Sequence, residues 1–191
     1  MDDPKKRATP FPDELQLDEP ILHFKINKYT RCIFYHVQRG ILRKCYNNHK
    51  EIKKAPVLIV EDRRILGIDL DHTNNYLFYY VKNNITLMDL NTMTKLTVYK
   101  TEEIITFMNY DFVELYLGSK HRKFYISTLT QSNHAIKVII LSLTGVEELS
   151  IPAKDKVVGV MNLETSYHVY TVKESFSYIL KTQSIGTVGL F

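Results

Sequence analysis

The segment 65–100 constrains the fold most strongly, because it contains four short apolar runs separated by polar residues that favour turns. The runs are rich in Tyr, Phe, Ile, Leu and Val, which is typical of β-strands. Asn residues in the intervening turns tolerate the left-handed backbone that tight hairpins need. The segment therefore predicts one four-stranded antiparallel sheet.

The same strand rhythm recurs along the chain, with first strands near residues 21, 66, 104 and 157. Four-stranded units that recur every 40–50 residues are the signature of propeller blades, since one small sheet with two apolar faces must stack against neighbours. We predict an all-β fold with about four four-stranded antiparallel blades of β-propeller type, in a small or incomplete propeller. A β-sandwich is the alternative. The predicted repeat units are 21–62, 65–101, 103–152 and 156–191.

Composition supports a packed domain after a short tail. Hydrophobic residues form 45% of the chain and aromatic residues 12%, which is ample for a core. Four prolines, Pro4, Pro10, Pro12 and Pro20, exclude a helix interior or a central strand near the N-terminus. We predict an extended or disordered tail at 1–19 and a propeller-like domain at 20–191.

The charge is mildly positive, at +4. The densest basic cluster, at 39–54, could contact an acidic partner or nucleic acid, but its charges are interrupted and it reads as a solvated hairpin and loop. No apolar run approaches the ~20 residues that span a bilayer, and no signal-peptide core is visible. We expect no nucleic-acid or membrane partner. The chain would be cytoplasmic if its N-terminus is authentic and extracellular if a signal peptide is missing.

Cys32 and Cys45 lie on neighbouring predicted strands, and their pairing depends on the loop between them. A two-residue loop at 38 and 39 places them opposite each other as a non-hydrogen-bonded pair, with Cα atoms about 4.5 Å apart, which a disulfide accepts. A three-residue loop with a left-handed Gly40 places Cys32 opposite Tyr46 instead. A disulfide implies an oxidising compartment, and two free buried thiols imply a reducing one. Both remain open.

Catalytic and metal-binding signatures are missing from the sequence. None of the seven His forms a zinc-type spacing with the two Cys. Asp69, Asp71 and Asp89 lie at strand ends, where carboxylates usually cap turn amides rather than bind metal. No nucleophile elbow or glycine-rich phosphate loop occurs. We predict a protein that is not an enzyme and has no cofactor.

Several tyrosines on predicted strands are candidate ligand contacts. A ring of them around an axial pocket would suit a flat aromatic molecule through stacking and hydroxyl contacts, although packing between blades needs the same residues. The candidates are Tyr79, Tyr116, Tyr125 and Tyr170.

The residues Ile68-Asp69, Asn75-Tyr76-Leu77-Phe78 and Ile85-Thr86-Leu87-Met88-Asp89-Leu90 resemble a blade of the YWTD and NHL type of propeller. The stretch is also similar to insect ommochrome-binding proteins, which are secreted pigment carriers. This resemblance covers about 35 residues and implies a propeller fold.

These observations predict a binding protein rather than a catalyst. Our first interpretation is a propeller-type protein that presents loops or an axial pocket to a small hydrophobic or aromatic ligand. The alternative is an intracellular scaffold for protein–protein interaction. A third is a metal-dependent, lactonase-like hydrolase whose carboxylates lie in axial loops.

Overall fold

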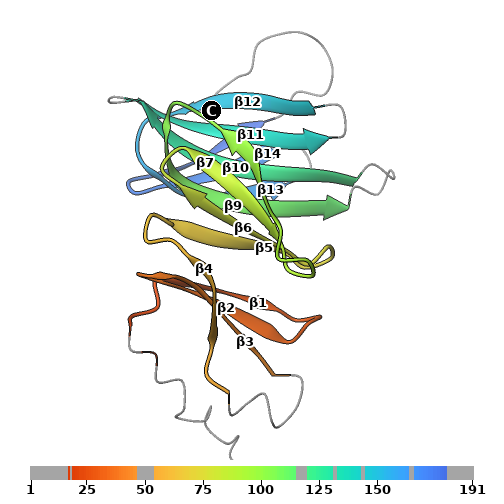
Figure 1. Cartoon of the computed structure of the whole chain (residues 1–191). Helices are drawn as coiled ribbons and strands as arrows, with labels where there is room; N and C mark the ends of the chain where they lie inside the picture. The colour runs from red at the N-terminus through yellow and green to blue at the C-terminus, as the bar shows by residue number, and fades with distance from the viewer. Residues whose placement is uncertain are drawn as a thin grey trace, which may run out of the picture. The chain divides into compact units, whose positions relative to one another are not determined.

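The computed structural model describes residues 17, 19–46, 54–114, 120–130, 133–142, 145–163 and 166–179. Every regular element in these ranges is a β-strand (Figure 1), so they contain no helix that could cross a membrane. The chain divides into two compact units, Met1–Arg63 and Arg64–Phe191, which are described separately.

The first unit contains one four-stranded antiparallel sheet in the order β1-β2-β3-β4. A two-residue turn joins β2 to β3, because Val37 pairs with Gly40. Gly40 has a φ of +147°, and a Cβ there would collide with the carbonyl oxygen of Val60 on β4. Only glycine fits this position without strain. The strands are β1 (His23–Asn27), β2 (Cys32–Val37), β3 (Gly40–Cys45) and β4 (Val57–Glu61).

The second unit contains three antiparallel sheets, each with strands in sequence order. The first comprises β5 (Gly67–Asp71), β6 (Tyr76–Val81), β7 (Asn84–Asp89) and β8 (Lys95–Lys100). The second comprises β9 (Ile104–Glu114), β10 (Lys120–Thr130), β11 (Asn133–Ser142) and β12 (Gly145–Ala153). The third comprises β13 (Val157–Leu163), β14 (Ser166–Thr171) and β15 (Ser175–Ile179).

The predicted all-β fold with blade-type antiparallel sheets is confirmed. The described residues form three four-stranded sheets and one three-stranded sheet. The end of the predicted fourth unit, 180–191, lies outside the described residues, as does nearly all of the predicted tail.

Stacking of sheets explains the near-continuous apolar sequence of β10. Phe124 and Ile126 belong to a core cluster that includes Phe78 of β6 and Tyr110 of β9. The intervening Tyr125 points to the opposite face and packs with β13 and β14 in a second cluster. Because successive side chains alternate between faces, a strand covered on both faces is apolar at every position.

Three turns share one five-residue design. In each, an Asn or Asp side-chain oxygen accepts hydrogen bonds from the backbone N–H groups two and three residues later. The fifth residue has a positive φ, between 51° and 62°. The side-chain acceptor replaces partners that the turn amides would otherwise lack. The first and fifth residues are Asn27 and Arg31, Asp71 and Asn75, and Asp89 and Met93.

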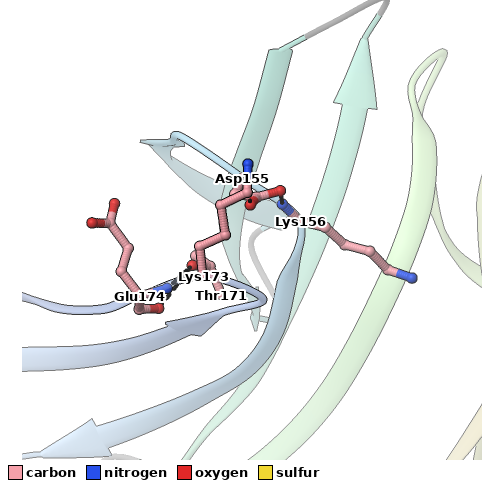
Figure 2. Close-up of polar contacts among 5 residues, drawn as sticks. All are labelled: Asp155, Lys156, Thr171, Lys173 and Glu174. Carbon is pink, nitrogen blue, oxygen red and sulfur yellow. Dashed lines mark hydrogen bonds and ion pairs between the residues drawn. The ribbon is translucent and has the colours of Figure 1, made fainter.

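A polar cluster lies at two turns of the second unit, one that precedes β13 and one between β14 and β15 (Figure 2). The Lys156 N–H donates to Asp155 (2.7 Å), and the Lys173 ammonium lies 3.3 Å from the same carboxylate. These contacts, the N–H of Lys156 foremost, lower the pKa of Asp155. The Thr171 hydroxyl donates to the Glu174 carbonyl (2.7 Å) and accepts from the Glu174 N–H (3.0 Å). The cluster is therefore explained as turn stabilisation.

Candidate interaction site

The first sheet carries apolar side chains that face solvent. Strand β1 and the residue before it alternate, with Leu22, Phe24 and Ile26 on one face and 52%, 59% and 51% exposed. On the other face, Asn27 and the paired His36 of β2 are buried. The apolar side chains of β1 are therefore exposed, whereas alternation usually places such side chains in a core.

The apolar side of β1 continues across all four strands as the outer face, whose exposed residues lie at its margins on β1 and β4. Phe24 pairs with Tyr35, Tyr35 with Leu42 and Leu42 with Leu58, which places one residue of each strand in a single row. Leu17 packs on a cluster of Tyr35, Val37 and Leu42, so the centre of the face is covered while its margins stay exposed. The outer face comprises Leu22, Phe24, Ile26, Tyr35, Val37, Leu42 and Leu58.

A pocket of about 250 Å³ lies beside this face, at the end of β3. It lies beyond the last pair of β3 and β4, since Val57, the first residue of β4, pairs with Arg43. Three of its lining residues are cations. The pocket is lined by Arg43, Lys44, Cys45, Lys54, Ala55 and Val57.

Lys44 is unusual among these cations because it is only 6% exposed. Its ammonium lies over the ring of Tyr46, 5.5 Å from the ring centroid. Within the part of the chain that the structure describes, none of Arg43, Lys44 and Lys54 forms an ion pair with a carboxylate. The pocket thus concentrates positive charge that no carboxylate of the described residues neutralises.

The charge of the chain is divided unevenly between the units. The segment Met1–Arg63 contains 13 Lys and Arg against nine Asp and Glu, whereas Arg64–Phe191 contains 12 of each. The whole net charge of +4 therefore falls in the first unit. Such an imbalance favours an acidic partner for this unit.

Cys32 and Cys45 face each other in the register of the two-residue turn. Their Cα atoms are 4.0 Å apart and their sulfur atoms form a disulfide. The bond joins β2 to β3 next to the pocket, since Cys45 also lines the pocket.

The three described tyrosines among those predicted to contact a ligand lie on different sheets. Tyr79 is buried on β6, and Tyr125 is fully buried on β10 with its ring 5.5 Å from that of Tyr167. Burial raises the pKa of Tyr125, as expected for a phenol packed inside a core. Tyr170 is 40% exposed on β14, and Tyr116 lies outside the described residues. The described three lie on three sheets and line no common pocket, and their role in ligand binding stays a prediction.

The three carboxylates weighed as metal ligands make structural hydrogen bonds. Asp71 and Asp89 accept from turn amides, as the sequence predicts. Asp69 does not cap a turn; its carboxylate accepts from the N–H of Leu70 and, across the sheet boundary, from the N–H of Tyr110 (2.9 Å each). In the described ranges no three His, Cys, Asp or Glu side chains gather closely enough to hold a metal ion.

The face of the first sheet opposite the outer face carries a histidine pair. His23 and His36 stack with their rings nearly parallel, 5.4 Å between centroids, and their Nδ1 atoms lie 3.1 Å apart. Burial, and secondly the charge of Lys25, lowers the pKa of His23. Two nitrogens so close share one proton, so one ring donates and the other accepts.

Sequence reasoning noted the basic cluster at 39–54 but missed the site itself. The strict alternation of apolar and polar residues over 22–27 was the available signal for the outer face. It could not show which side of the strand lies open.

Comparison with known proteins identifies the fold. No protein-family model and no curated protein sequence matches the chain. Among solved structures, the AfRom2 CNH domain is similar over 87% of this chain and 54% of its own length, with a TM-score of 0.65 and 12% identity. The WD40 domain of SCAP from fission yeast is similar over 92% of this chain and 43% of its own length, with a TM-score of 0.53 and 9% identity.

The chain thus spans about half the length of these structures. Both are propeller domains, which confirms a resemblance of the propeller type, although neither is a YWTD, NHL or ommochrome-binding protein. At such low identity the likeness concerns the fold alone. The chain is an all-β protein built from antiparallel sheets of the kind that form CNH and WD40 propeller domains.

Proposed function

We propose that this protein is a non-enzymatic scaffold that binds an acidic protein partner through the outer face of its first sheet. The observation that carries the proposal is the row of large apolar side chains at Leu22, Phe24 and Ile26, each more than half exposed. Contiguous exposed apolar surface costs free energy in water and is typical of protein interaction sites.

Charge specifies the chemistry of the partner. The first unit carries the whole positive excess of the chain, so a partner with acidic residues around an apolar patch would complement it in both respects. The likeness to a WD40 domain agrees with this proposal, and so does the shape of the face. An exposed row of side chains along an edge strand suits a protein surface better than a small ligand, which prefers a concave site.

The pocket beside the outer face does not suit the small hydrophobic ligand of our first interpretation. It is smaller than the ~300–1,000 Å³ typical of sites for drug-sized ligands. Among the described residues, its lining contains three cations and no aromatic side chain.

The test compares two matched pairs of substitutions in the full chain. Phe24→Ser with Ile26→Ser removes the centre of the exposed row, and Val158→Ser with Met161→Ser removes two similarly exposed apolar residues of β13. Proteins captured from a lysate would be quantified with each variant, and a captured partner would then be purified for direct titration. We expect the β1 pair to weaken binding by at least about tenfold, since one anchor residue contributes roughly 2 kcal/mol.

Three results would contradict the proposal. The β1 variant could bind the partner as tightly as the wild type, or the β13 variant could lose binding equally. Alternatively, light scattering could show that the outer face holds a second copy of this chain, as a dimer that the β1 substitutions dissociate.

A further inference from the structure

The pocket at the end of β3 is lined by three cations that no carboxylate of the described residues neutralises. A Lys side chain can bury its alkyl part while its ammonium keeps contact with water. Lys44 is 94% buried, and the ring of Tyr46 supplies only a weak cation–π contact. No carboxylate of the described residues pairs with it. The pocket is thus prepared electrostatically for an anion from outside.

The donors around the pocket match an oxyanion with several oxygens. Arg43 presents a planar guanidinium that can bind two oxygens at once, and Lys44 and Lys54 add two point charges. Cys45 belongs to a non-hydrogen-bonded pair with Cys32, so its N–H points away from β2, towards the side on which β4 has not yet begun. Three cations together favour a dianion over a single carboxylate.

The position of the pocket connects it to the outer face. Lys44 lies two residues from Leu42 on the same side of β3, and it pairs with Ile33, which in turn pairs with Ile26. Val57 at the pocket wall is followed by Leu58 of the outer face. An anion in the pocket would therefore lie directly beside a partner bound to the apolar row.

We infer that the pocket binds the phosphate monoester of a phosphorylated residue on the protein partner. The inference rests on the proposed function for its source of phosphate, because the partner would place an apolar segment on the outer face and a phosphorylated side chain in the pocket. Phosphate at neutral pH carries nearly two negative charges and three acceptor oxygens, which this donor set can satisfy.

The first experiment needs no partner. The full chain is titrated with O-phosphoserine by calorimetry and by thermal unfolding, with chloride at equal ionic strength as the reference. We expect saturable binding and a higher Tm with O-phosphoserine than with chloride. Arg43→Gln and Lys54→Gln should each weaken binding by about tenfold or more, since a charge-assisted hydrogen bond contributes 1.5–3 kcal/mol. Lys28→Gln, an equal charge change beside Tyr29 and outside the pocket, should change it less than about twofold.

Lys44→Met gives a second, independent readout in which folding defects cannot mimic the expected result. If the ammonium lacks a counter-charge, its replacement by an apolar side chain of similar length should leave the Tm unchanged or higher without phosphate. The same variant should lose the increase in Tm that O-phosphoserine causes. A lower Tm with the phosphate response retained would overturn the inference, because it would show that Lys44 is paired within the protein.

The second experiment separates this inference from the proposed function and identifies the source of phosphate. Phe24→Ser with Ile26→Ser should abolish partner binding yet leave O-phosphoserine binding intact. Lys54→Gln should weaken the binding of the phosphorylated partner but not that of its dephosphorylated form. If O-phosphoserine binds and the partner's phosphate state has no effect, the phosphopeptide source is refuted. Tighter binding to phosphoinositide vesicles than to a phosphopeptide would likewise refute it and assign the pocket to a lipid headgroup.

Discussion

Replacing Tyr110 by Phe tests the hydrogen bonds that fix β9 against the sheet of β5–β8. The Tyr110 hydroxyl donates to Asp71 Oδ2 at 2.7 Å, and its backbone N–H donates to Asp69 Oδ2 at 2.9 Å. Both contacts are buried. The substitution removes only the first of them, and it keeps the ring, whose centroid lies 4.6 Å from Phe78 and 5.1 Å from Phe124.

The expected loss follows from the remaining contacts of Asp71. A hydrogen bond to a charged acceptor contributes about 1.5–3 kcal/mol. Asp71 Oδ2 also accepts from the Asn74 amide at 2.7 Å, so the substitution leaves this oxygen with a donor. The loss should therefore lie in the lower half of that range, at about 1.5–2 kcal/mol. For a chain of this size, this corresponds to a Tm lower by roughly 3–8 °C.

Urea and thermal unfolding, followed by circular dichroism, would measure the change. Tyr170→Phe is the matched control, since its exposed hydroxyl makes no contact comparable to that of Tyr110, and it should alter the free energy of unfolding by less than about 0.5 kcal/mol. In a double-mutant cycle, Tyr110→Phe and Asp71→Asn should be coupled by at least about 0.5 kcal/mol. Additive effects, or a Tyr110→Phe variant as stable as the wild type, would refute the assigned hydrogen bond.

Three further predictions address the first sheet and its turns. Reduction of Cys32–Cys45, or substitution of both by Ser, should lower the free energy of unfolding by about 3 kcal/mol, because the bond closes a loop with a sequence separation of 13. An unchanged urea midpoint and no two-dalton mass shift on reduction would contradict the bond. Met93→Asn should stabilise the protein by about 0.5–1 kcal/mol, since Met93 has a φ of 62° and Asn tolerates this region better; a lower midpoint would contradict this account. The pKa of His23 is lowered below 6.5 in the folded protein, so the unfolded chain binds more protons as the pH falls. The contribution of neutral His23 to stability is therefore present above about pH 6.5 and is lost below it. His23→Gln should reduce the fall in stability between about pH 7.5 and 5.5, and an equally steep fall would exclude His23 as its cause.

Local sequence was sufficient to predict the sheets, since strand length, turn residues and apolar runs all act within a few residues. The same local chemistry predicted that Asp71 and Asp89 cap turns. It was less informative about backbone conformation. Asn75 has the left-handed conformation expected of Asn, but Arg31 and Met93 adopt it at the equivalent turn position, where their side chains give no such signal. The capping oxygen four residues earlier fixes these turns, and the residue at the fifth position accepts the strain.

Contacts between sheets could not be read from the sequence. Asp69 looks like Asp71 in its surroundings along the chain, yet it bonds to an N–H 41 residues later. Nothing near Asp69 specifies this partner, because the contact depends on how two sheets stack. The ligand-binding role of Tyr125 could not be judged from the sequence either. A strand with both faces covered requires a large apolar side chain whether or not a ligand is present.

The outer face shows how stacking, rather than local pattern, decides what an apolar residue does. Strand β10 has both faces covered by other sheets, and its apolar residues form the core. Strand β1 has equally apolar residues on a face that leaves them half exposed. Alternation predicts that one side of β1 is apolar but not that its residues are exposed. Exposed apolar area costs about 25 cal/mol per Å², so covering Leu22, Phe24 and Ile26 would lower the free energy of the protein. The basic pocket next to them then restricts the covering surface to one that is both apolar and anionic, which is why a phosphorylated acidic partner satisfies this sheet better than an apolar one.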